Sequence, residues 1–256
     1  MNAQALIVLA VMGLMIGSFL NVCIGRLPAG ESVVSPGSRC PSCRTAIRWY
    51  DNVPVLSYLL LGGRCRKCRA SISVRYPIIE AVTAVAFVAQ GLAVGPDVWL
   101  LTQRLVLTAL LITMFGTDLE TQRLPNVLTL PGVVVGFLFS FMVAPGPVDS
   151  ALGIALGGGV LLAIRAGWKV TTGVDGMGLG DVKMLAMVGA FLGWQQVLVV
   201  LLFSSLSGAV IGILLTTLQG KSLQHRLPFG TFIAIGAFAA SLIGEPVIAW
   251  YLQFYQ

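Results

Sequence analysis

The chain has 256 residues, of which 57% are hydrophobic and only 10% are charged, and its formal net charge is +6. With a mean hydropathy of +0.91, this composition excludes a soluble globular protein and predicts an integral membrane protein. Apolar runs of helical length recur along the sequence, and the alternating ten-residue pattern of an outer-membrane barrel does not occur. The expected fold class is therefore all-α, a polytopic helical bundle in the membrane.

About eight apolar segments follow one another along the chain. The first carries no Lys or Arg ahead of it and no cleavage site after it, so we expect a retained membrane helix and not a signal peptide. The sixth is only about half as long as the bilayer core requires, and we expect a short, partly recessed helix there. The segments cover approximately residues 5–24, 77–94, 99–117, 124–144, 150–165, 184–194, 197–218 and 228–251.

The basic residues are distributed unevenly among the connecting loops. An N-terminus outside the cell would place four loops in the cytoplasm: residues 25–76, 118–123, 165–183 and 219–226. These loops and their edges contain every Lys and Arg except Arg104. Because cytoplasmic loops of membrane proteins carry an excess of Lys and Arg, the pattern predicts this topology and explains the net charge without a nucleic-acid partner. His225, in the last of these loops, is expected to be a solvated surface residue.

Four of the five cysteines form two C-x-x-C motifs in the polar segment 25–76, with 21 residues between the motifs. This spacing is close to that of a zinc ribbon with four thiolates. A cytoplasmic location disfavours two disulfides, because that compartment keeps thiols reduced. A segment of about fifty residues also buries only a small hydrophobic core, so we expect a bound metal ion to stabilise its fold. The predicted zinc ligands are Cys40, Cys43, Cys65 and Cys68, and Cys23 is expected to be a small buried hydrophobe.

Two aspartates end apolar or glycine-rich stretches on the same predicted membrane face. Asp118 ends the third apolar segment, and Asp181 ends the sequence Gly-Met-Gly-Leu-Gly-Asp. Two carboxylates that share a site of low dielectric do not both ionise, so one keeps a proton while the other acts as a base, as in an aspartic protease. The alternatives are that Asp181 caps a helix beside packing glycines and that Asp118 only begins a loop. We expect Gly178 and Gly180 to let a short loop enter the membrane face.

Motifs along nearly the whole chain resemble those of bacterial type IV prepilin peptidases, which are aspartic proteases of the GxGD type. The segments Asp118-Leu119-Glu120 with Leu124-Pro125-Asn126, and Gly178-Leu179-Gly180-Asp181-Val182-Lys183, are similar to the two catalytic signatures of that family. Asn126 departs from the pattern, because the family often has Asp there. The N-terminal motifs are Gly17-Ser18-Phe19-Leu20-Asn21-Val22, Arg26-Leu27-Pro28, the two cysteine pairs, Asp51-Asn52-Val53-Pro54 and Arg75-Tyr76-Pro77.

The resemblance implies a protein of the bacterial inner membrane that removes the short basic leader of type IV prepilins or type II secretion pseudopilins at the cytoplasmic face. It implies that Asp118 and Asp181 are the catalytic pair, and that Gly178, Gly180 and Lys183 form a supporting active-site loop. Family members that carry the cysteine segment also N-methylate the new terminal residue with S-adenosylmethionine, so both activities are expected here.

Three regions are expected: a first transmembrane helix at 1–24, a cytoplasmic zinc domain linked to N-methylation at 25–76, and a membrane-embedded peptidase domain at 77–256. A basic leader gains nothing from a basic domain, so Glu80 and Glu120 are candidate substrate-binding residues. Two alternatives stay open. One is a peptidase whose cysteine domain is purely structural; the other is a carboxylate-coupled transporter, against which stand the lack of a repeat between halves and the placement of both aspartates at one face.

Overall fold

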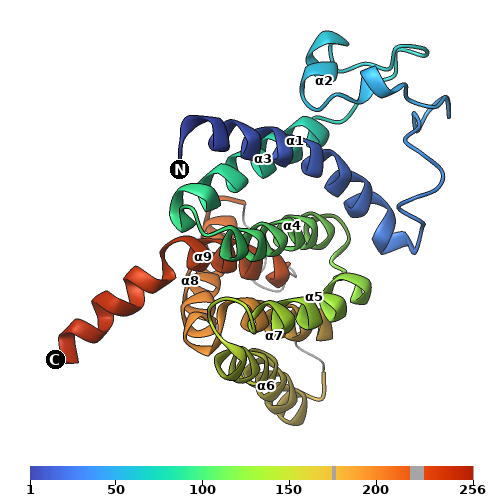
Figure 1. Cartoon of the computed structure of the whole chain (residues 1–256). Helices are drawn as coiled ribbons and strands as arrows, with labels where there is room; N and C mark the ends of the chain where they lie inside the picture. Colours follow the sequence, from blue (N-terminus) through green and yellow to red (C-terminus); the bar gives the residue numbers. More distant parts are fainter. Residues whose placement is uncertain (175–176, 220–227, 256) are drawn as a thin grey trace. The chain divides into compact units, whose positions relative to one another are not determined.

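The computed structural model describes residues 1–174, 177–219 and 228–255 and divides into two compact units, Met1–Pro96 and Asp97–Gln256 (Figure 1). The regular elements in these residues are helices, together with two isolated β-bridges in the cysteine segment. The predicted all-α class is therefore confirmed. Gly176, which begins the Gly-Met-Gly-Leu-Gly-Asp sequence, and residues 220–226 of the last predicted cytoplasmic loop, with His225, lie outside the described residues.

Eight apolar helices occupy the eight predicted segments of the described chain. Six of them are long and apolar enough to cross a membrane: α1 (Ala3–Arg26), α3 (Arg75–Val94), α4 (Val98–Thr121), α6 (Pro147–Thr172), α8 (Trp194–Gln219) and α9 (Phe229–Leu252). The other two, α5 (Asn126–Phe139) and α7 (Leu179–Leu192), have 14 residues each. A helix of that length spans only about 21 Å, less than the hydrocarbon core of about 30 Å. The protein is thus a multi-pass membrane protein with two shorter apolar helices.

Several boundaries differ from those expected. Helix α6 continues to Thr172, past the predicted end at Arg165, and stops at Gly173, whose positive φ of 73° suits a glycine C-cap. Helix α7 begins at Leu179, so part of the expected glycine-rich loop is its first turn. Helix α5 begins after Pro125, whose ring fixes φ and which ends the preceding extended stretch.

The first unit is built on close packing of α1 against α3. A Cβ atom added at Gly13 would lie 2.5 Å from the Cα of Ala84, and one at Gly17 would lie 2.8 Å from the Cα of Glu80. These contacts show that the two helices are antiparallel, and they require glycine, as in other tightly packed membrane helices. The boundary between the compact units therefore follows α3, at residue 96, whereas the expected peptidase domain was to begin before that helix at residue 77.

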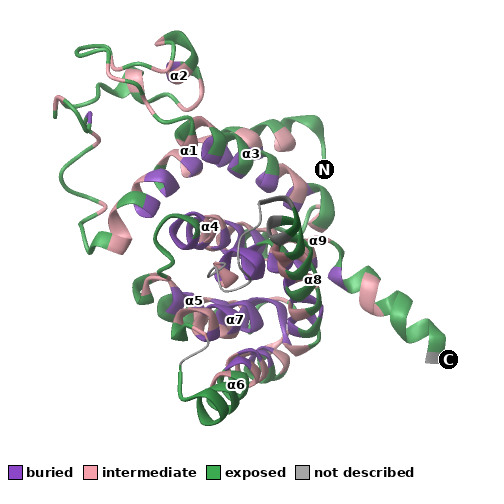
Figure 2. Cartoon of the chain, turned by 180° about the vertical axis from the view of Figure 1, so that it is seen from behind, coloured by how far each residue is buried: buried purple, intermediate pink, exposed green. Residues whose placement is uncertain are grey.

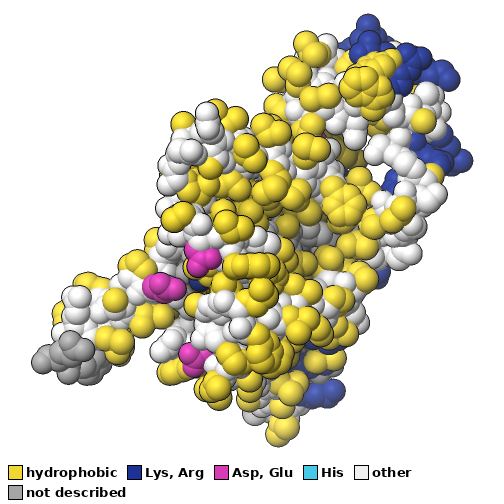
Figure 3. All heavy atoms as spheres, viewed as in Figure 1, with side chains coloured by type: hydrophobic (Ala, Val, Ile, Leu, Met, Phe, Trp, Pro, Cys, Tyr) yellow, Lys and Arg dark blue, Asp and Glu magenta, His cyan; other side chains and the backbone are white. Residues whose placement is uncertain are grey.

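Between α1 and α3 lies the extramembrane cysteine segment. Its regular elements are short: η1 (Leu27–Ala29), η2 (Trp49–Asn52) and α2 (Leu56–Leu60). Figure 3 shows Lys and Arg side chains gathered over this part of the chain. Asp51 in η2 forms a bidentate ion pair with Arg66, in which Nη2 lies 2.7 Å from Oδ1 and Nε lies 2.9 Å from Oδ2. This pair connects η2 to the second cysteine motif.

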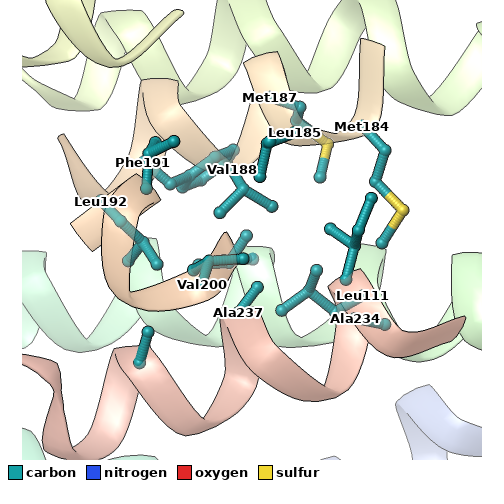
Figure 4. Close-up of a cluster of buried hydrophobic side chains, with 14 of the residues drawn as sticks. Leu111, Met184, Leu185, Met187, Val188, Phe191, Leu192, Val200, Ala234 and Ala237 are labelled. Carbon is teal, nitrogen blue, oxygen red and sulfur yellow. The ribbon is translucent and has the colours of Figure 1, made fainter. Parts of the chain in front are cut away.

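Helix α7 forms the centre of the second unit. After its first turn, which carries Asp181 and Lys183, it is apolar on all sides and mostly buried, as Figure 2 shows, which is the pattern of a helix surrounded by other helices. Gly157 of α6 allows backbone contact with α7, because a Cβ atom there would lie 2.5 Å from the carbonyl oxygen of Leu185. Figure 4 shows how the core side chains converge from α4, α7, α8 and α9, among them Leu111, Met184, Leu185, Val188, Phe191, Val200, Ala234 and Ala237.

Candidate active site and metal centre

Asp118 lies near the end of α4 and is 4% exposed. Its Oδ2 accepts a 2.8 Å hydrogen bond from the backbone N–H of Thr231 and a 3.1 Å hydrogen bond from the hydroxyl of the same residue. Thr231 belongs to the first turn of α9. The carboxylate therefore sits at the N-terminus of a helix, where free N–H groups and the helix dipole favour a negative group.

Asp181 lies in the first turn of α7. Its carboxylate accepts the backbone N–H of Gly178, the N-cap residue of that helix, three positions earlier. This is half of a capping box, in which an acidic residue at the third position reaches back to the N-cap. The expectation of a loop here is wrong for Gly180, Asp181 and Lys183, which are helical.

The two carboxylates come together in the second unit. Burial, and after it the negative charge of Asp118, raise the pKa of Asp181 to about 7. Asp181 is thus close enough to Asp118 for each charge to oppose the other, and a proton shared by such a pair titrates as a property of both groups. A carboxyl group that holds its proton near neutral pH beside a second carboxyl group is the arrangement that acid and base catalysis use.

Leu124 fills the space between the two helix starts. A Cβ atom at Gly180 of α7 would lie 3.0 Å from the Leu124 Cβ, and one at Gly230 of α9 would lie 3.0 Å from its Cδ1. Neither Gly178 nor Gly180 is among the glycines with positive φ. Neither residue is therefore needed for a left-handed backbone conformation, and Gly180 lies in the first turn of α7 and not in the short loop that we expected. Gly180 permits close approach to Leu124 instead.

Lys183 connects the two signature segments. Its Nζ donates a 2.8 Å hydrogen bond to Oδ1 of Asn126, the first residue of α5. In a chain with Asp at this position, the lysine would form an ion pair. In this sequence it forms a hydrogen bond between a cation and the neutral amide of Asn126 instead.

The two candidate substrate-binding glutamates have different surroundings. Glu80 is 6% exposed and accepts a 2.7 Å hydrogen bond from the backbone N–H of Val55. Val55 has a φ of 59° and a ψ of −50°, a costly conformation for a β-branched residue. Glu80 thus fixes a strained turn of the cysteine segment. Glu120 is exposed in the last turn of α4, two residues after Asp118.

The four predicted metal ligands form one cluster. The Sγ atoms of Cys40, Cys43, Cys65 and Cys68 all lie within 4.8 Å of one another, and those of Cys40 and Cys68 are 3.7 Å apart. In a tetrahedral zinc site with Zn–S bonds of about 2.3 Å, the sulfurs are about 3.8 Å apart. The sulfur positions therefore fit a zinc ion bound by four thiolates.

The two cysteine motifs fold in the same way. Each is followed by an arginine in the left-handed region, Arg44 with a φ of 56° and Arg69 with a φ of 59°. The N–H groups of these arginines donate to the carbonyls of Cys40 and Cys65, at 2.9 and 3.0 Å respectively. Two similar turns facing each other hold the four sulfurs in place without a large core. The sequence signal for this repeat is the common pattern C-x-x-C-Arg.

Two residues of the site were not identified from the sequence, Gly230 and Thr231. A Cβ atom at Gly230 would lie 2.9 Å from Oδ2 of Asp118. One signal was available: Pro228, the N-cap of α9, provides no side-chain cap, so the first N–H groups of that helix need an acceptor from elsewhere. The sequence does not say that this acceptor is Asp118.

Sequence comparisons agree with this division into units. Residues 11–94 match the profile of the bacterial peptidase A24 N-terminal domain, and residues 105–213 match that of the type IV leader peptidase family. No solved structure matches the chain.

Several relatives are similar over most of their length, and all carry the name prepilin leader peptidase/N-methyltransferase. The protein of Aeromonas hydrophila is 40% identical over 93% of this chain and 91% of its own length. That of Pseudomonas aeruginosa is 36% identical over 95% of this chain and 92% of its own length. That of Myxococcus xanthus is 42% identical over 84% of this chain and 64% of its own length. With these similarities and both family profiles matched in order, the chain belongs to the type IV leader peptidase family.

Proposed function

We propose that this protein cleaves the leader peptide of type IV prepilins or type II secretion pseudopilins and N-methylates the new N-terminal residue. The proposal is supported by the names of relatives that are similar over nearly the whole chain. The observation that carries it is the convergence of Asp118 and Asp181, from two signature segments, within the unit that matches the peptidase profile. A carboxylate-coupled transporter has no comparable support.

In the proposed peptidase reaction, Asp118 is the base and Asp181 the acid. Asp118 takes a proton from water as the water oxygen attacks the carbonyl carbon of the scissile bond. Asp181, which keeps its proton near neutral pH, donates a hydrogen bond to the carbonyl oxygen, where negative charge develops. The tetrahedral intermediate then breaks its C–N bond, and the leaving amine receives a proton from the pair. Gly178, Gly180 and Lys183 support this site by shaping the first turn of α7.

The cysteine segment is proposed to serve N-methylation. A zinc held by four thiolates has no open coordination position, so its role would be structural. S-adenosylmethionine would supply the methyl group to the amine of the cleaved pilin, which loses a proton. We place this domain at residues 25–76, and the peptidase domain at 77–256, following the first helix at 1–24.

Topology and substrate recognition complete the proposal. The distribution of Lys and Arg supports an N-terminus outside and an active site facing the cytoplasm of a bacterial inner membrane. The apolar segment of the pilin would dock in the bilayer, and its basic leader would lie near exposed acidic groups. Glu120 meets this requirement. Glu80 does so less well, because it is buried and hydrogen-bonded within the first unit.

The test is to replace each aspartate and to measure the two activities separately. Asp118→Asn and Asp181→Asn should abolish cleavage of a prepilin while leaving methylation of an already mature pilin peptide intact. The control is Asp97→Asn, because Asp97 is the N-cap of α4 and asparagine caps a helix equally well. Cleavage by either active-site variant would contradict the assignment of the dyad.

A further inference from the structure

The peptidase family profile ends at residue 213, before α9 begins at Phe229. Nevertheless, the residues that hold Asp118 lie in the first turn of α9. Resting on the proposed function, we infer that Gly230 and Thr231 are positioning residues of the peptidase site, and that α9 is a functional part of the enzyme as well as a membrane anchor.

Capping of α9 is the first observation that supports this inference. Helix α9 starts after Pro228, which has no N–H group and whose side chain caps nothing. The first N–H groups of a helix need acceptors, and the Asp118 carboxylate supplies one from another helix, at 2.8 Å from the Thr231 nitrogen. Asp118 therefore caps α9, and the dipole of α9 in turn acts on the carboxylate.

The direction of the hydrogen bonds to Asp118 is the second observation that supports the inference. The amide and the hydroxyl of Thr231 both donate to the same oxygen, Oδ2 of Asp118. Two donors on one oxygen fix the rotation of the carboxyl group, so the same face of it is always turned away from α9. The backbone N–H of Gly230 also donates to this carboxylate, so the first turn of α9 supplies all three of these donors. A catalytic base must hold such an orientation closely, because small displacements reduce the rate strongly.

The close approach of Gly230 to Asp118 is the third observation that supports the inference. A Cβ atom at Gly230 would lie 2.9 Å from Oδ2 and 3.1 Å from Cγ of Asp118. Any side chain at this position would push the carboxyl group away from the Thr231 amide. Since the same Cβ would also lie 3.0 Å from Cδ1 of Leu124, there is little room to shift on that side.

The main test removes the Thr231 hydroxyl. Thr231→Val keeps the shape and the backbone N–H, whereas Thr231→Ser keeps the hydroxyl. A hydrogen bond to a charged group is worth about a factor of ten or more, so we expect Thr231→Val to lower the kcat for prepilin cleavage about 10-fold with little change in KM. Thr231→Ser should retain nearly full activity, and only Thr231→Val should change the pH dependence of kcat.

The matched control is Thr113→Val, the same substitution on α4. Thr113 is also buried, at 2% exposure, and its hydroxyl donates to the carbonyl of Ala109 in its own helix. This control should cleave like the wild type. Gly230→Ala should be more severe than Thr231→Val, with a loss of about 100-fold, because it displaces the whole carboxyl group. Cooperative thermal unfolding of each purified variant reports whether it is folded.

Thr231→Ala is measured in parallel, so that the outcome does not depend on how the valine side chain fits. The inference is overturned if any folded variant without the hydroxyl has the kcat of the wild type, or if Thr113→Val loses as much as Thr231→Val. The wild type and Asp118→Asn distinguish failure of the inference from failure of the proposed function. If the wild type does not cleave a prepilin, the proposed function fails, and if Asp118→Asn still cleaves, the assignment of the dyad fails. If Asp118→Asn is inactive while Thr231→Val and Thr231→Ala are normal, only the role of Thr231 fails.

Discussion

Lys183 Nζ donates a 2.8 Å hydrogen bond to Asn126 Oδ1. This contact joins the first turn of α7, which carries Asp181, to the first residue of α5, which follows the loop after Asp118. The two signature segments are therefore connected twice, by the packing of Gly180 on Leu124 and by this hydrogen bond. Both contacts link the helix that carries Asp181 to the segment that follows Asp118.

The hydrogen bond between Lys183 and Asn126 can be tested by changing its acceptor. Asn126→Asp replaces the amide by a carboxylate and should keep cleavage within about twofold of the wild type, because a partly exposed ion pair contributes little. Asn126→Leu removes the acceptor and should lower kcat/KM about fivefold. Steady-state cleavage of a prepilin measures both. Equal rates in the two variants would show that the contact has no role in catalysis.

The raised pKa of Asp181 predicts the pH dependence of cleavage. If Asp181 must be protonated, kcat should fall as the pH rises through about 7. The folded state also binds this proton more tightly than the unfolded state, whose carboxyl has an ordinary pKa. Stability should therefore decrease as the pH rises from about 4 to about 7. The thermal unfolding temperature should fall over this pH range in the wild type and should fall less in Asp181→Asn. An equal dependence of the unfolding temperature on pH in both proteins would contradict the raised pKa of Asp181.

The glycines before Asp181 should differ in their tolerance of side chains. A Cβ atom at Gly180 would lie 3.0 Å from Leu124, whereas one at Gly178 would lie 3.4 Å from the Asp181 Oδ2 and 3.9 Å from the Gly180 nitrogen, which are ordinary contacts. Gly180→Val should therefore reduce cleavage by at least about 100-fold, while Gly178→Ala should remain within a few-fold of the wild type. Cooperative thermal unfolding of each purified variant serves as the folding control. A reversed order of the two variants would mean that backbone freedom matters more than close packing.

Removal of the metal should separate the two activities. Cys65→Ser leaves three thiolates, so we expect the zinc content to fall from one ion per chain to nearly none, and methylation to be lost with it. Cleavage should persist, because the two aspartates belong to the other compact unit. Cys23→Ala is the control, since Cys23 is buried in α1 and lies outside the cluster. Zinc bound at full stoichiometry by Cys65→Ser would contradict the four-thiolate site.

Much of the fold follows from local properties of the chain. Hydropathy along the sequence located the eight apolar helices of the described residues, because burial in lipid demands long apolar runs. The cysteine spacing predicted the metal cluster, because a C-x-x-C turn brings two sulfurs together by short-range geometry. Helix boundaries were less predictable. Asp181 was expected in a loop, but its carboxylate accepts the N–H of Gly178 and extends α7 backwards.

The sequence by itself determined the class of protein, the four clustered cysteines and the two aspartates, since each depends on composition or on spacing within a short stretch. Only the tertiary structure decided what surrounds Asp118. Its partner Thr231 is 113 residues away, and nothing within either segment encodes that distance. The role of Gly180 was decided in the same way, by the side chain of Leu124 from another part of the chain. Contacts of this kind depend on how helices pack, which hydropathy and local spacing do not specify.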